Sequence, residues 1–286
     1  MNKALVLSGG ANKGAFQVGA LKYLCKNNNY NILCGTSVGA LNCSFLAMYN
    51  DKNTGINDLI NIWKNLNQSN IFTRHFPFGR LHGLIKSNLY NSNSLEKLIN
   101  KIIDRSKILK TSNKVCVETV CLNTGNLISV TEQDENFKDF VLASCSFPGL
   151  FKPIKIKNKF YLDGGIKSMT PLTKAIELGA DSIDVILCSP ENNIQPINEN
   201  SNSIEIIKRT IDLMVDSILE SDIKKAILYN RLLEHEDIKN KRKVEINIIR
   251  PEFVLTNDSF CFDKKIIEYM IEIGNVTAKR YFEDKA

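Results

Sequence analysis

YNILCGTSVGALNCSFLAM, residues 30–48, places a short apolar strand directly before a sharp turn and a helix of small residues. The turn is the G-x-S-x-G sequence from Gly35 to Gly39, whose glycines let the backbone bend and leave room around Ser37. A helix that begins at Val38 points its N-terminal N–H groups at this serine, which favours negative charge developing there. The stretch predicts a nucleophilic serine suited to acyl transfer. A glycine-lined turn around a buried serine is the alternative.

The composition predicts one enzyme-sized α/β unit. The chain has 286 residues with 43% hydrophobic content, enough for a large core. A net charge of +6 favours an anionic surface such as phospholipid headgroups, but it is too dispersed for a nucleic-acid footprint. We therefore predict no nucleic-acid partner.

The location is predicted from the cysteines and the apolar runs. Eight cysteines are scattered without a C-x-x-C pair, which favours reduced thiols in the cytosol. The apolar run at residues 3–7 is far too short for a signal-peptide core and leads straight into a glycine turn, and no apolar run is long enough to span a bilayer. We expect a cytoplasmic protein, with peripheral contact to an anionic membrane as a further option.

A glycine-rich loop follows the first predicted strand, at residues 4–7, and leads into a helix at residues 15–26. Its small residues expose backbone N–H groups that can cradle an oxyanion or a phosphate. The dinucleotide-binding spacing G-x-G-x-x-G fails at Ala11. Lys13 opposes the dipole of the helix it precedes, and a bound anion would remove that conflict. A solvated surface lysine is an equal alternative.

Four motifs in order resemble those of the patatin-like phospholipases. The loop Gly9-Gly10-Ala11-Asn12-Lys13-Gly14 resembles their oxyanion loop, and residues 35–39 resemble their serine elbow. Residues 143–148 (ASCSFP) are similar to the family's A-S-x-x-F-P segment, and Asp163-Gly164-Gly165 looks like its D-G-[GA] motif. The likeness covers roughly residues 3–178 and departs at Ala11, where the family usually has glycine. It implies a lipid acyl hydrolase, with Asp163 as the catalytic aspartate and backbone N–H groups of Gly9, Gly10 and Ala11 as the oxyanion hole.

Ser37 needs a base, because a serine hydroxyl is a weak nucleophile until its proton is accepted. A triad would use histidine, but His75 and His82 lie in an aromatic segment and His235 lies late in a charged helix. The simplest assignment is a Ser37–Asp163 dyad, in which partial burial raises the basicity of the carboxylate. The resemblance implies the same pair, and no metal or organic cofactor is implied. An acyltransferase or thioesterase with this dyad and a non-catalytic anionic-lipid-binding module stay open.

The predicted fold is a three-layer α/β/α protein with a mostly parallel central sheet, folded as one domain over residues 1–286. We expect a catalytic core at about residues 3–180, a cap-like insertion at about 51–113 and a helical extension at about 203–286. Residues 70–90 mix aromatics with cations, which suits either a membrane interface or a cap packed on the core. Residues 203–236 form one amphipathic helix or a broken pair, and their mixed charges favour core packing over membrane contact.

Overall fold

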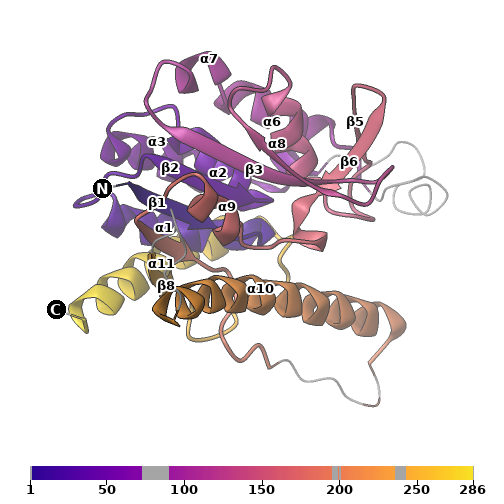
Figure 1. Ribbon diagram of the computed structural model, residues 1–286. Helices are drawn as coiled ribbons and strands as arrows, with labels where there is room; N and C mark the ends of the chain where they lie inside the picture. Colours follow the sequence, from indigo (N-terminus) through magenta and orange to yellow (C-terminus); the bar gives the residue numbers. More distant parts are fainter. Residues whose placement is uncertain (1, 73–89, 195–198, 200, 236–242, 286) are drawn as a thin grey trace.

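Residues 2–72, 90–194, 199, 201–235 and 243–285 are described by a computed structural model, and in them one eight-stranded sheet runs through the centre of the molecule (Figure 1). Its strands are β1 (Lys3–Leu7), β2 (Ile32–Thr36), β3 (Lys114–Cys121), β4 (Leu127–Thr131), β5 (Ile154–Ile156), β6 (Lys159–Asp163), β7 (Ser182–Ile186) and β8 (Glu245–Ile249). Their order is β5-β6-β3-β2-β1-β7-β8, and β4 pairs with β3 beside this path. The four pairs along the run β3-β2-β1-β7-β8 are parallel. The pairs of β3 with β4, β3 with β6 and β5 with β6 are antiparallel. The predicted mostly parallel sheet is confirmed.

Helices cover both faces of this sheet and give the predicted three-layer architecture. The larger layer consists of α1 (Gly14–Leu24), α2 (Val38–Leu46), α3 (Lys52–Lys64), α6 (Asn93–Ile102), α8 (Phe137–Ser144) and α11 (Lys264–Glu283). On the other face lie α9 (Leu172–Glu177) and α10 (Ser203–His235). Short helical segments are η1 (Ala11–Lys13), α4 (Gln68–Ile71), α7 (Arg105–Ile108) and η2 (Gly164–Ile166).

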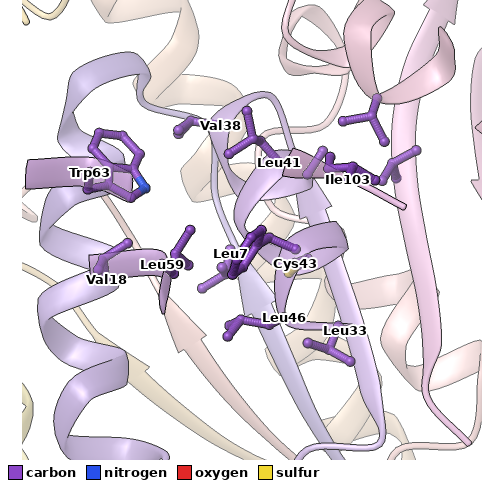
Figure 2. Close-up of a cluster of buried hydrophobic side chains, with 14 of the residues drawn as sticks. Leu7, Val18, Leu33, Val38, Leu41, Cys43, Leu46, Leu59, Trp63 and Ile103 are labelled. Carbon is purple, nitrogen blue, oxygen red and sulfur yellow. The ribbon is translucent and has the colours of Figure 1, made fainter. Parts of the chain in front are cut away.

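The apolar runs of the central strands become the two faces of the core. Along β1, Leu5 and Leu7 join the cluster beneath the larger helical layer, while Ala4 and Val6 join the cluster beneath α9 and α10. Alternate side chains of a strand point to opposite faces, so a parallel strand covered on both sides is apolar throughout. Figure 2 shows Leu7 beside side chains of the larger layer.

The C-terminal part of the chain is packed into the same core. β8 extends the sheet by pairing with β7, and α11 lies against α1. The two helices approach so closely that a Cβ atom at Gly19 would lie 1.9 Å from the Ile271 carbonyl oxygen, and one at Gly274 would lie 2.0 Å from that of Phe16. Glycine at these two positions is therefore what allows the helix pair to form.

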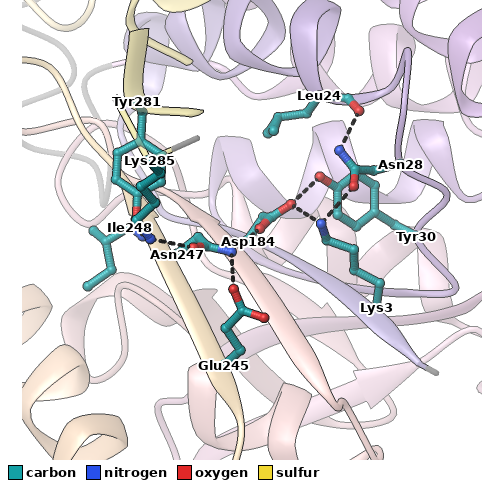
Figure 3. A network of polar contacts seen from close by, with 10 residues as sticks. All are labelled: Lys3, Leu24, Asn28, Tyr30, Asp184, Glu245, Asn247, Ile248, Tyr281 and Lys285. Atoms are coloured by element: carbon teal, nitrogen blue, oxygen red, sulfur yellow. Dashed lines mark hydrogen bonds and ion pairs between the residues drawn. The ribbon is translucent and has the colours of Figure 1, made fainter. Parts of the chain in front are cut away.

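A buried polar network around Asp184 links three strands (Figure 3). Its carboxylate accepts hydrogen bonds from the Tyr30 hydroxyl at 2.5 Å and the Asn247 amide at 3.0 Å, and it pairs with Lys3 Nζ at 3.0 Å. Burial and the neighbouring carboxylate raise the pKa of Tyr30 well above its ordinary value. Each side chain here has a partner among these residues, so we read the network as a structural tie between β1, β7 and β8.

Two expectations for the outer segments have different outcomes. Residues 203–235 form one helix, α10, but its predicted core packing is correct only for the second half, where Leu219, Ile223 and Ala226 are buried. Ile207 and Met214 in the first half are exposed. A helix of this length extends about 50 Å, much farther than the strands it crosses, so one end has no core to pack on.

Most of the segment that mixes aromatics with cations lies outside the described residues, at residues 73–89. It includes Arg74, His75, Arg80, His82 and Lys86.

Candidate active site

The loops after β1, β2 and β6 bring the candidate residues together. Parallel pairing of β1 with β2 sets the glycine loop beside Ser37. The Asp163 residue ends β6 opposite Thr119 near the carboxyl end of β3. Both Ser37 and Asp163 line one cavity, so the topology unites motifs that are far apart in the sequence.

Ser37 has the strained backbone that a nucleophile elbow requires. Its φ and ψ are 57° and −128°, a conformation that residues other than glycine seldom adopt. A Cβ atom at Gly35 would lie 2.3 Å from the Gly39 carbonyl, and one at Gly39 would lie 2.2 Å from the Leu7 carbonyl oxygen. The Ser37 N–H donates to Ser144 Oγ at 2.9 Å, which holds the elbow in place. The two glycines of the motif are thus needed for close approach.

The Asp163 carboxyl group is buried beside the serine. Its Oδ1 accepts a hydrogen bond from the Gly165 N–H at 2.8 Å, and among the described residues its buried Oδ2 accepts none in good geometry. Burial raises the pKa of Asp163 to about 7, although the Ser37 hydroxyl and the Gly165 N–H lower it. A carboxyl group that titrates near neutral pH can accept a proton in one step and return it in the next.

The two glycines after Asp163 also have a steric reason. A Cβ atom at Gly164 would lie 2.4 Å from the Glu118 carbonyl oxygen, and one at Gly165 would lie 2.6 Å from Met169 Sδ. Glu118 is itself buried, and burial raises the pKa of its carboxyl group to about 7. Sequence reasoning did not single out Glu118, because its burial depends on segments distant in the chain.

The oxyanion loop differs from expectation at its first residue. The Gly9 N–H donates to the Met169 carbonyl at 3.1 Å, so this group is already engaged. Within the described part of the chain, the N–H groups of Gly10 and Ala11 have no such acceptor and stay open. The φ of Ala11 is 50°, in the left-handed region that favours glycine, which gives a physical reason for the glycine that is usual in related loops.

A cavity of about 420 Å³ opens next to Ser37 and Asp163. Aromatic side chains from several segments line much of it, and Phe72 stacks on Phe151 with ring centroids 5.4 Å apart. The aromatic lining residues are Trp63, Phe72, Phe147, Phe151, Phe260 and Phe262. They come from four separate stretches of sequence, so only the fold reveals them as one wall. The apolar cavity suits a hydrocarbon chain.

Lys13 lies at this cavity and makes no ion pair within the described residues. It is half-buried, and its charge lowers the pKa of Asp216, which burial raises overall. The structure describes no histidine side chain, since His75 and His82 lie outside the described residues and His235 is placed only by its backbone. None of the described helices has the length and apolar character needed to cross a membrane.

The family resemblance is confirmed by a family model and supported by a curated relative. The family model of the patatin-like phospholipases matches residues 5–176, more than half of the chain. The protein described as Probable lipid hydrolase 463L of Invertebrate iridescent virus 6 is 24% identical over 275 residues, covering 86% of this chain and 92% of the relative. The crystal structure of VipD from Legionella pneumophila is 14% identical with a TM-score of 0.47, and the match covers 99% of this chain and 67% of VipD. The chain belongs to the patatin-like phospholipase family and is an esterase that acts on carboxylic ester bonds.

Proposed function

We propose that the protein is a phospholipase A or lysophospholipase that hydrolyses fatty-acyl esters with a Ser37–Asp163 dyad. The observation that carries this proposal is the buried carboxyl group of Asp163, which has a pKa of about 7 and one oxygen without a hydrogen-bond partner among the described residues, beside a serine on a strained elbow. Such a group can act as a base at neutral pH without a histidine.

The reaction follows from the positions of these groups. Asp163 accepts the Ser37 proton while Oγ attacks the acyl carbonyl carbon, and the N–H groups of Gly10 and Ala11 stabilise the resulting oxyanion. Collapse of this intermediate releases the alcohol, which takes the proton from Asp163. Asp163 then deprotonates a water molecule that attacks the acyl-enzyme. When this second intermediate collapses, the free acid leaves and Ser37 Oγ takes the proton back from Asp163. Every proton in this cycle is held by Asp163, so we infer no metal or organic cofactor.

The substrate class is inferred from the cavity beside Ser37. Its volume of about 420 Å³ and its aromatic lining suit the acyl chain of a lipid. We propose that Lys13 binds the phosphate of the headgroup, because its ammonium group lies at the cavity without an ion pair among the described residues. If so, Lys13→Met lowers activity on phospholipid more than on a neutral ester, and equal losses would assign Lys13 to support of the loop.

The test of the dyad measures release of fatty acid from a phospholipid and of p-nitrophenol from a soluble acyl ester. Ser37→Ala and Asp163→Asn should each lower turnover by about 10⁴-fold or more, and the double variant should lose little more than either. Ser221→Ala and Asp139→Asn, at exposed positions, are matched controls that should keep full activity.

Two outcomes contradict this proposal. A folded Ser37→Ala variant that retains most of its activity removes the serine from the mechanism. A wild type that transfers the acyl group to added alcohols or thiols, and releases little free acid, is an acyltransferase with the same dyad.

A further inference from the structure

The first half of α10 exposes five large apolar side chains, while several of its polar side chains contact neighbouring loops. Ile206, Ile207, Leu213 and Met214 are 49%, 59%, 52% and 63% exposed. These side chains, together with Ile211, are called the apolar face of α10 below. Surface helices ordinarily bury their apolar stripe against the core, so this arrangement is the reverse of the usual one.

Polar contacts hold the helix in this orientation. Arg209 Nη2 donates to the Asn193 carbonyl at 2.7 Å, and the Asn193 amide donates to Asp216 at 2.7 Å. Lys208 Nζ donates to the Asn257 carbonyl. Because the polar side of the helix is bound to neighbouring loops, the apolar face is fixed outward.

The apolar face is continuous with the cavity at Ser37. Ile207 and Ile211 line the cavity, and Met214 lies within about 60° of them around the helix. Ile206 and Leu213 extend the same surface farther around the helix, away from the cavity. In Figure 1 these first turns of α10 project from the body of the molecule. An apolar path therefore leads from the outside of α10 to the catalytic serine.

We propose that the apolar face of α10 docks on the surface of a membrane or lipid aggregate and turns the cavity mouth toward it. This inference rests on the proposed lipid substrate. A protein partner on this face would cover the route by which a lipid reaches Ser37, whereas a lipid surface supplies that route. Isoleucine, leucine and methionine side chains insert among acyl chains, and Lys13 and Lys208 at the cavity lie where headgroup phosphates would meet them.

The test is flotation of the inactive Ser37→Ala protein with vesicles of phosphatidylcholine, alone or in an equal mixture with phosphatidylglycerol. The variant Ile206→Gln/Leu213→Gln/Met214→Gln changes residues that do not line the cavity. Its vesicle partition should fall about tenfold or more on both lipids and should stay low at high salt, since apolar insertion is not screened. With Ser37 restored, turnover of a soluble ester should be unchanged, and turnover of vesicle phospholipid should fall together with partition.

A matched control is available on the other half of the same helix. Ile227, Leu228 and Leu232 are 40%, 55% and 49% exposed and lie about 30–40 Å from Ile206 along the helix axis. Replacing these three with glutamine should leave partition unchanged.

Three results would overturn the proposal: unchanged partition of the first variant, an equal fall in the control, or a change from dimer to monomer in light scattering with partition intact. The last would assign the face to a second copy of the chain. Partition is measured on inactive protein, so failure of the proposed catalysis would appear separately in the ester assay.

Discussion

At the scale of single residues, two buried carboxyl groups at the site lower the stability of the fold when they are charged. Burial raises the pKa of Asp163 from 3.8 and that of Glu118 from 4.5, each to about 7. The folded state thus binds these protons more tightly than the unfolded state, so the stabilising contribution is full below about pH 4 and is lost as the pH rises through about 7. For Glu118, this pKa shift corresponds to a decrease of about 3 kcal/mol in the free energy of unfolding over that pH range.

We therefore expect Asp163→Asn to be inactive yet more stable than the wild type at about pH 8 by a few kcal/mol, because the amide carries no charge to desolvate. Glu118→Gln should gain similar stability and keep its activity. Urea unfolding at about pH 5 and about pH 8 measures this, and the advantage of both variants should shrink at the lower pH. Parallel pH profiles for the wild type and the variants would contradict the expectation.

The pH dependence of turnover gives a second measure of the Asp163 carboxyl group. Since the base must be deprotonated, wild-type turnover should rise with pH through about 7, while Glu118→Gln should keep the same profile. If Glu118→Gln shifts the pH profile of turnover, the group that titrates is Glu118 and not Asp163, which would contradict the prediction.

That Ser37 and Asp163 lie at one cavity could be predicted from sequence, because each lies in a short motif whose glycines have local steric roles, while their catalytic roles stay a proposal. The engagement of the Gly9 N–H could not be predicted, since its acceptor is Met169, 160 positions later, and nothing near Gly9 indicates it. The two serines whose hydroxyls hydrogen-bond to the Glu118 carboxyl group, Ser129 and Ser168, likewise lie on other segments of the chain.

At the scale of elements, apolar runs and turn residues predicted the strands well. Residues 115–122 and 127–130, with turn residues between them, predict one hairpin, and residues 154–156 and 160–162 predict a second. The structure has both, as β3 with β4 and β5 with β6, because the turn residues between the strands are a local signal. The helical pattern of residues 57–66 predicts a helix there, and α3 begins before it at Lys52, since Asp51 accepts hydrogen bonds from the N–H groups of Asn53 and Thr54 and caps the helix.

The sequence predicted that α10 is a helix, but it did not predict which parts of its apolar face are buried. Apolar residues at helical spacing in α10 indicated a buried stripe, and the second half of the helix has one. The first half repeats the pattern where no core lies beneath it. Periodicity reports that a face is apolar, but the fold decides whether protein covers that face.

At the scale of the whole molecule, residues beyond the matched family region complete the site. Asp222 on α10 accepts hydrogen bonds from the N–H groups of Met169 at 2.9 Å and Thr170 at 3.0 Å. Met169 in turn accepts the Gly9 N–H through its carbonyl, and a side chain added at Gly9 or Gly165 would meet its thioether. Asp222 therefore connects α10 to both the oxyanion loop and the Asp163 turn. This tie, together with β8 and α11, supports our proposal that residues 1–286 fold as one domain.

We predict that Asp222 is a positioning residue for the reaction. Asp222→Ala leaves two buried N–H groups without an acceptor, at about 1–3 kcal/mol each, and lets the Met169 segment move. Turnover of a soluble ester should fall about 10²-fold in kcat with little change in KM, because a small displacement of catalytic groups costs rate rather than binding. Asp222→Asn keeps an oxygen that can accept one or both hydrogen bonds, so it should recover most of the lost kcat.

The matched control for Asp222 is Glu220→Gln, which removes a nearby charge of α10 that pairs with Arg250 instead of the Met169 segment. It should keep both kcat and KM. If α10 only stabilised the fold, each variant would lose activity in proportion to the decrease in its melting temperature. The loss in kcat would then disappear when kcat is calculated per folded molecule. A kcat that falls in Asp222→Ala at a temperature where the variant is fully folded, and returns in Asp222→Asn, would mean that the C-terminal part of the chain sets the geometry in which Ser37 reacts.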